Sequence, residues 1–150
     1  MILALGSDHA GFELKEDLKR FLGELGVEVK DFGPTDDVSV DYPDYGADVA
    51  QAVASGKSDG GVLIDGSGIG MSIVANKYPK VRAALVTSVY AARMAKRHMQ
   101  ANVLCFSGWF TGKGEAREML RTWIETEFEG GRHQRRVDKI REIEERLRGT

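Results

Sequence analysis

The sequence contains a single cysteine, Cys105, in a chain of 150 residues. One thiol excludes an intrachain disulfide framework and favours a reducing compartment. Because Cys105 lies in the apolar run "NVLCF", it is expected to be buried and inert rather than a nucleophile. No apolar run approaches the ~20 residues that a bilayer-spanning helix requires, and the first residues show no basic leader. These absences predict a cytoplasmic protein.

A strong charge of either sign is also missing, since the formal net charge is −2 at pH 7. The chain therefore has no field that would attract a polyanion, and nucleic acid is not an expected partner. Its apolar share of 42% and charged share of 29% are those of an ordinary globular protein. With no internal repeat or low-complexity segment, residues 1–150 are expected to form a single domain.

Short apolar runs alternate with amphipathic segments along nearly the whole chain. The runs expected to form strands are residues 2–6, 27–32, 61–65, 82–86 and 102–108. The segments expected to form helices are residues 14–25, 44–54, 70–77, 88–98 and 113–128. This alternation predicts a three-layer α/β/α, Rossmann-like fold with five parallel strands and helices on both faces of the sheet.

A further helix is expected at residues 134–148, after the break at "GGR". Its apolar residues form one stripe, consisting of Val137, Ile140, Ile143 and Leu147. A helix that follows the last unit of the sheet must bury such a stripe either on its own domain or on a second subunit. Because little else in the segment is apolar, the pattern favours a partner chain.

Polar residues stand at strand ends, where open parallel sheets bind their ligands. Asp8 and His9 follow the first strand, and Asp65 and Ser67 follow the third. His98 ends the helix before the fifth strand, near that strand's start. Taken singly, the aspartate could cap a helix and His98 could be a surface cation stabilised by a helix dipole. Taken together, these residues favour a binding or catalytic site.

The third strand leads into the glycine-rich loop "GSGIG", residues 66–70. Such a loop, opening a helix, can direct several backbone N–H groups at an anion, although it could equally be a tight turn. Its spacing differs from the G-x-G-x-x-G pattern of dinucleotide-binding proteins. Asp65 beside the loop favours a different chemistry, in which a carboxylate accepts a proton next to a developing oxyanion.

Near the C-terminus, "GGRHQRR" contains Arg132 and Arg136, four residues apart. On a helix these two arginines share a face and could grip one phosphate. The alternative is a solvated helix face. Nucleic-acid binding is poorly supported, because no aromatic residues interleave with the basic ones.

In chain order, the motifs "GSDHAGFELK", "DYPDY", "DGGVLIDGSGIGMSIVANK", "VRAAL", "ANVL" and "EGGRHQRRV" resemble the family of ribose-5-phosphate isomerase B and the galactose-6-phosphate isomerase subunits. The resemblance extends from residue 2 to about residue 146. It implies a Rossmann-like fold in a homodimer or homotetramer whose active sites are shared between subunits. It also implies isomerisation of a small phosphosugar through a cis-enediolate, with no metal and no cofactor.

The resemblance also assigns roles to residues of this chain. The positions that match substrate-binding residues are Asp8, His9, Tyr42, Gly66, Gly68, Gly70, Arg132, His133 and Arg136. The candidate catalytic residues are Asp65, Ser67 and His98. In this comparison the glycine loop provides an anion hole for the enediolate, and His98 matches the histidine that opens the sugar ring.

Three residues depart from the family's pattern. Asp65 stands where many relatives have a cysteine base, and Met71 stands where another branch has a glutamate base. Asp65 is therefore the only side chain of the loop that is expected to take the proton. Met99 replaces an asparagine that would hydrogen-bond the sugar, which affects the choice of substrate more than the reaction.

The leading hypothesis is an isomerase that converts ribose 5-phosphate to ribulose 5-phosphate. Three alternatives stay open at the level of sequence: the same chemistry on another phosphosugar of four to six carbons, a non-catalytic phosphosugar-binding module, and a flavodoxin-like FMN protein. The last is disfavoured, because the chain lacks a hydroxyl-rich first loop and obvious flanking aromatics.

Overall fold

The computed structural model describes residues 1–149, so that Thr150, the last residue of the predicted domain, lies outside it. The strands are β1 (Ile2–Ser7), β2 (Glu28–Asp31), β3 (Gly60–Asp65), β4 (Ala83–Leu85) and β5 (Val103–Ser107). The helices are α1 (Phe12–Glu24), α2 (Tyr42–Ala54), α3 (Ile69–Ala75), α4 (Val89–Met99), α5 (Lys113–Glu125) and α6 (Arg132–Arg148). None of the helices in residues 1–149 combines the length and the apolar character of a bilayer-spanning segment.

The five strands form one parallel sheet in the order β2-β1-β3-β5-β4, which confirms the predicted Rossmann-like fold class. All six residues of the central strand β3 are buried, as expected for a strand with helices on both faces. The edge strands β2 and β4 are short and only partly buried. The predicted strands differ from the observed ones by one or two residues at their ends.

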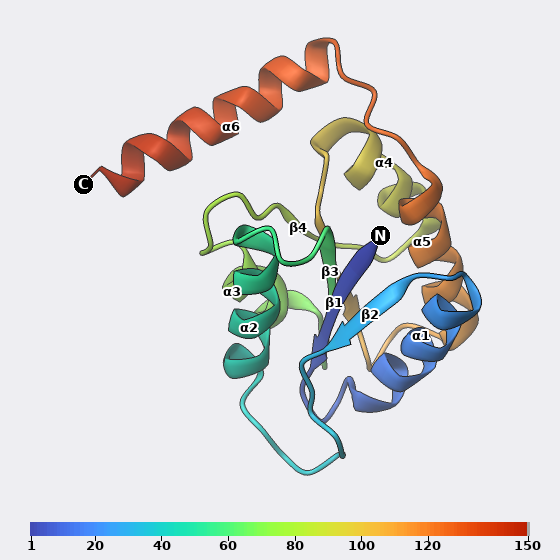
Figure 1. The fold of residues 1–150 in the computed structure, drawn as a ribbon. Helices are drawn as coiled ribbons and strands as arrows, with labels where there is room; N and C mark the ends of the chain where they lie inside the picture. The colour runs from blue at the N-terminus through green and yellow to red at the C-terminus, as the bar shows by residue number, and fades with distance from the viewer. Residues whose placement is uncertain (150) are drawn as a thin grey trace.

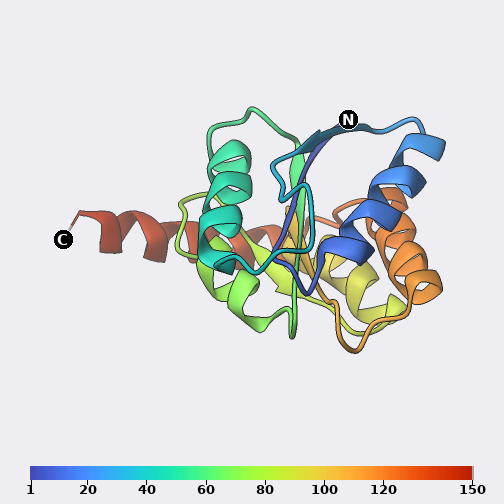
Figure 2. The same ribbon diagram turned by 90° about the horizontal axis from the view of Figure 1, so that it is seen from below.

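Two helical layers cover the sheet. Helices α1, α4 and α5 lie on one face, and α2 and α3 lie on the other, as Figure 2 shows with the sheet between them. Each face buries its own apolar cluster: Leu18 and Phe106 belong to the first, and Val49 and Leu63 to the second. Cys105 is fully buried in the second cluster, which confirms the prediction that this thiol lies in the core.

Helix α6 projects from the body of the molecule and passes the edge of the sheet at β4 (Figure 1). The carboxylate of Glu144 tethers it, accepting a hydrogen bond from the backbone N–H of Lys80 with both oxygens at 3.0 Å. Of the predicted apolar stripe, Val137 is buried within its own chain at 5% exposure, which corrects the expectation that the whole stripe awaits a partner. Ile140 and Ile143 are 49% and 46% exposed. The outer part of the stripe therefore remains open to solvent in one chain.

Candidate active site

Two carboxylates meet at the carboxyl edge of the sheet. Asp8 follows β1 directly and Asp65 ends β3, and the N–H of Asp8 donates to the carbonyl of Ile64 at 3.1 Å. Both side chains face a cavity of about 510 Å³. The cavity is lined by Asp8, His9, Ala10, Tyr42, Asp65, Gly66, Ser67, Ile69, Gly70, Ile73 and Trp109. The structure thus brings together most of the candidate residues from the first half of the chain.

Asp65 is a buried carboxylate with an unusual environment. The residue is 5% exposed, and its Oδ1 is buried without a hydrogen-bond partner among the described residues. Burial, and then the neighbouring charge of Asp8, raise the pKa of the Asp65 carboxyl above its usual value. Backbone N–H groups of Gly68 and Met71 oppose this rise by stabilising the charged form. Because its pKa is raised, the buried Asp65 carboxylate is a stronger base than an exposed aspartate.

The glycine loop is held by the turn that follows β5. Ser107 Oγ donates a hydrogen bond to the carbonyl of Gly66 at 2.7 Å, and the N–H of Trp109 donates to the same carbonyl at 3.1 Å. Gly68 adopts a φ of +81°, a left-handed conformation that disfavours any residue with a side chain. This fixed backbone sets the direction of the N–H groups beside Asp65.

Different N–H groups of the loop have different partners. The N–H groups of Gly68 and Met71 act on the Asp65 carboxylate, and Ser67 Oγ accepts from the N–H of Ile69 at 3.1 Å. Within residues 1–149, the N–H groups of Ser67 and Gly70 have no acceptor. The Ser67 side chain therefore stabilises the loop, while these two N–H groups are available to a ligand.

The loop between β2 and α2 contacts His9, which lines the cavity. His9 Nδ1 accepts a hydrogen bond from the N–H of Val40 at 3.2 Å, so that Nε2 carries the proton when the ring is neutral. Asp8 Oδ1 accepts from the N–H of Gly11 at 3.1 Å just before α1, which is the structural role considered for this residue. Tyr42 packs so closely on Gly70 that a Cβ there would lie 2.7 Å from its ring.

His98 and His133 lie at the other edge of the sheet. Asp65 is level with Ser107, the last residue of β5, whereas His98 lies just before β5 begins at Val103. The four strand steps between these levels span roughly 13 Å. Within a single chain, His98 therefore does not join Asp8 and Asp65, contrary to the expectation that the polar strand ends would form one site.

The two histidines form a second cluster with Glu129. Their rings stack with centroids 3.9 Å apart and an interplanar angle of 7°. Glu129 Oε2 lies 3.4 Å from His98 Nε2 and 3.1 Å from His133 Nε2. Burial, and then the charges of His98 and Arg132, lower the pKa of His133. Arg132 and Arg136 are exposed at the start of α6 and are not among the residues that line the Asp65 cavity.

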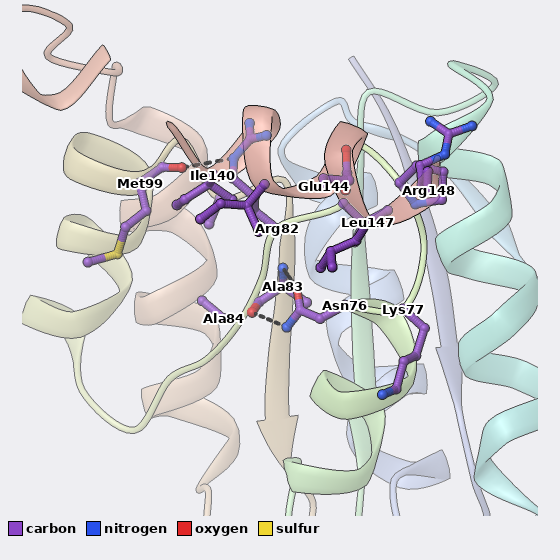
Figure 3. Close-up of a pocket in the computed structure, with 14 residues that line it drawn as sticks. Asn76, Lys77, Arg82, Ala83, Ala84, Met99, Ile140, Glu144, Leu147 and Arg148 are labelled. Atoms are coloured by element: carbon purple, nitrogen blue, oxygen red, sulfur yellow. Dashed lines mark hydrogen bonds between the residues drawn. The ribbon is translucent and has the colours of Figure 1, made fainter. Parts of the chain in front are cut away.

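A groove of about 630 Å³ runs between α6 and the edge of the sheet at β4. Ile140 and Leu147 face it from α6, opposite Ala83 and Ala84 of β4 (Figure 3), and Met99 at the end of α4 lines its margin. Met99 is therefore part of an apolar groove rather than of the Asp65 cavity. Met71, at the other position where relatives have a base, is fully buried in the core.

Sequence reasoning missed several residues at these two sites. Trp109, Ile69 and Ile73 line the Asp65 cavity, and Glu129 joins the two histidines. Trp109 could have been found, because it follows the carboxyl end of β5 and such positions face the ligand. Glu129 gave a weaker signal, four residues before His133 across two glycines.

The fold and the cavity define a Rossmann-like α/β protein with a small-molecule site at the carboxyl ends of its strands. The chain belongs to the Ribose/Galactose Isomerase family, whose sequence model matches residues 3–140. It is 44% identical to ribose-5-phosphate isomerase B of Escherichia coli over 144 residues, which cover 96% of this chain and 97% of that protein. The chain is accordingly an isomerase.

Solved structures agree with this family. Ribose-5-phosphate isomerase B of Clostridium thermocellum superposes with a TM-score of 0.96 at 48% identity, covering 98% of this chain and 99% of that one. The Mycoplasma genitalium ribose-5-phosphate isomerase B with bound ribulose-5-phosphate superposes with a TM-score of 0.93 at 40% identity, covering 96% of each chain. The similarity extends over nearly the whole of both proteins, including the elements that form the cavity.

Proposed function

We propose that this protein interconverts ribose 5-phosphate and ribulose 5-phosphate through a cis-enediolate, with Asp65 as the base. The observation that supports this most is the buried Asp65 carboxylate, whose pKa is raised, beside loop N–H groups that have no acceptor in residues 1–149. The relative from Mycoplasma genitalium with bound ribulose-5-phosphate supports the choice of substrate.

In the proposed reaction, Asp65 removes the proton from C2 of the open-chain aldose. The electron pair of the C–H bond forms a C1–C2 double bond, and the carbonyl oxygen on C1 becomes an oxyanion. The N–H groups of Ser67 and Gly70 stabilise this oxyanion, an effect whose loss typically costs ~10²–10³ in rate. Asp65 then returns the proton to C1, the hydroxyl proton moves from O2 to the O1 oxyanion, and the ketose results. No other reactant is consumed.

The phosphate requires positive charge that the Asp65 cavity does not supply. Its described lining contains the carboxylates of Asp8 and Asp65 and no lysine or arginine. Arg132 and Arg136 share one face of α6, which projects from the body (Figure 1). We therefore propose that a second copy brings these arginines of its α6, together with its His98 and His133, to the Asp65 cavity, and that His98 then assists ring opening. The phosphate would bind between two chains.

The apolar groove beneath α6 supports the second copy as its occupant. The exposed Ile140 and Ile143 belong to the same helix as the arginines, so that one interface would cover the apolar stripe and place the basic residues. In a two-fold symmetric dimer each chain would contribute to both sites. The alternative substrate is another phosphosugar of four to six carbons, because Met99 stands in the region of His98 and offers the sugar no polar hydrogen.

A panel of aldose phosphates tests the proposed reaction. Ketose formation from ribose 5-phosphate should exceed that from four- and six-carbon phosphosugars. Calorimetry on the same preparation measures binding separately. Binding of ribose 5-phosphate with no turnover would identify a phosphosugar-binding module and contradict the proposal, and a higher kcat/KM for another phosphosugar would replace the substrate.

Subunit mixing tests the shared site. Asp65→Asn and Arg132→Ala chains would each damage a different half of every site, so either variant alone should be weakly active below saturating substrate. After exchange of subunits, mixed dimers contain one intact site, and the mixture should recover about a quarter of the wild-type rate. Sedimentation should show a dimer or tetramer in the same buffer. A monomer, or a mixture no more active than the average of its parents, would contradict the shared site.

A further inference from the structure

His98, Glu129 and His133 offer three metal-ligating atoms that all lie within 4.8 Å of one another. They come from the last turn of α4, from the connection between α5 and α6, and from the first turn of α6. The Asp65 cavity does not include them. This cluster therefore has its own chemistry within one chain.

Backbone hydrogen bonds and a turn of two glycines bring the side chains of the cluster together. The N–H of Glu129 donates to the carbonyl of Arg97 at 3.0 Å, which attaches the connection to the last turn of α4. Gly130 and Gly131 follow with φ of +71° and +56°, both in the left-handed region. The N–H of His133 then donates to the carbonyl of Gly130 at 3.0 Å. The resulting turn brings the side chains of Glu129 and His133 to face each other.

His133 contains a polar atom that lacks a partner. The residue is 5% exposed, and its Nε2 makes no hydrogen bond within residues 1–149, although Glu129 Oε2 lies only 3.1 Å away. The imidazole nitrogen and the carboxylate oxygen are both atoms that can ligate a cation. A cation held between them would provide a partner for the buried Nε2.

We propose that His98, Glu129 and His133 bind a divalent transition-metal ion, for which Zn²⁺ is the probe. Two imidazoles and a carboxylate are a ligand set that suits zinc. Two ligands of a tetrahedral Zn²⁺ at ~2.0–2.1 Å lie about 3.3 Å apart. Glu129 Oε2 lies 3.1 Å and 3.4 Å from the two Nε2 atoms, which matches that spacing.

Metal binding requires the His98 ring to move, and Arg97 competes with the ion for Glu129. The stacked rings direct their lone pairs side by side, so His98, whose side chain is 32% exposed, must turn towards the ion. Arg97 Nε lies 3.6 Å from Glu129 Oε2 and competes with a cation for that oxygen. The partial exposure of His98 and Glu129 leaves room for water as a fourth ligand. Mg²⁺, which prefers an octahedron of oxygen ligands, should bind poorly.

The ion would be an inhibitor rather than a cofactor. Occupation of His98 and His133 would remove both from the proposed phosphosugar site, so Zn²⁺ should slow the isomerase, and a chelator should restore it. The binding itself does not depend on the proposed reaction, because it is measured on the protein without substrate. A failure of the isomerase assay would therefore leave the metal proposal standing, and the reverse also holds.

Calorimetric titration of the chelator-treated protein with Zn²⁺ tests the proposal, with the visible spectrum of bound Co²⁺ as a second readout of tetrahedral geometry. One ion per chain is expected. Glu129→Gln and His133→Asn should each weaken binding by at least about tenfold. His9→Asn, which removes the one histidine outside the cluster, should leave it unchanged, and Arg97→Gln should tighten it. Thermal melting curves should be recorded for each variant to verify that it is folded.

Two results would overturn the proposal. If Zn²⁺ binds with wild-type affinity to both Glu129→Gln and His133→Asn, the ion occupies another site. If the wild-type protein takes up no Zn²⁺ or Co²⁺, the cluster is only an ion pair. Glu129 is partly exposed, so Glu129→Gln remains informative even if His133→Asn fails to fold.

Discussion

Asp65→Asn should lower the catalytic rate and at the same time stabilise the fold. Asparagine keeps the shape of the side chain but cannot accept the proton from C2. A positioned general base typically contributes ~10²–10⁴ to the rate, so kcat should fall by about that factor. KM should change little, because the proposed phosphate contacts are made by the arginines of α6 and not by Asp65.

The same substitution should stabilise the fold. Burial and Asp8 raise the pKa of Asp65 in the folded chain, so the folded state holds the proton more tightly than the unfolded state does. Stability then falls as the pH rises through the unfolded pKa towards the folded one, and at neutral pH the charge on Asp65 is destabilising. Removing it should stabilise the protein by on the order of 1 kcal/mol. In a chain of this size that is about 2–4 °C in melting temperature.

A coupled assay and thermal melts between neutral and acidic pH measure both effects. The gain in melting temperature should shrink as the pH falls and the wild-type carboxyl becomes protonated. Asp65→Cys provides a comparison, because the family resemblance implies a cysteine base at this position, and this variant should keep some activity with a changed pH optimum. A variant Asp65→Asn that turns over at the wild-type rate, or that melts below the wild type at neutral pH, would refute the reasoning.

Further predictions concern the surroundings of the base and the phosphate. Asp8→Asn removes the charge that helps to raise the pKa of Asp65, so the acidic limb of the pH–rate profile should move to lower pH. If the limb does not move, it does not report the ionisation of Asp65. Gly70→Ala would place a Cβ 2.8 Å from the Asp65 carboxylate and should lower kcat by about 10² by displacing it, as measured at saturating substrate. Arg132→Ala should raise KM far more than it lowers kcat, and an unchanged KM would exclude it from the phosphate site. Thiol reagents should leave the initial rate intact, because Cys105 is buried and burial raises the pKa of its thiol.

The fold could be predicted because its strands are apolar on both faces. Runs such as "GVLID" at residues 61–65 have no polar face, which in an α/β alternation leaves only a central parallel strand. The end of that strand then placed Asp65 at the ligand edge, and the same rule placed Asp8 beside it. These two predictions needed only the strand positions and the parallel direction.

The other half of the candidate site depends on information that is not local. His98 ends the helix that leads into β5, so it lies at the end of the sheet where the strands begin. Asp65 lies at the opposite end, where the strands finish. The position of Arg132 depends on how α6 leaves the body after two left-handed glycines, which periodicity does not encode. Val137 differs from the rest of its stripe for the same reason: only near its start does the helix bury an apolar residue of the stripe within its own chain.

The position of helix α6 also affects how the activity of the enzyme depends on its own concentration. If it supplies the phosphate-binding arginines to a neighbour, newly made chains are inert until they meet, and specific activity should rise with protein concentration before reaching a plateau. A cell would then obtain disproportionately more flux from each doubling of a scarce enzyme. Dilution in an assay would have the opposite effect, and a lag after dilution would report the rate at which subunits separate.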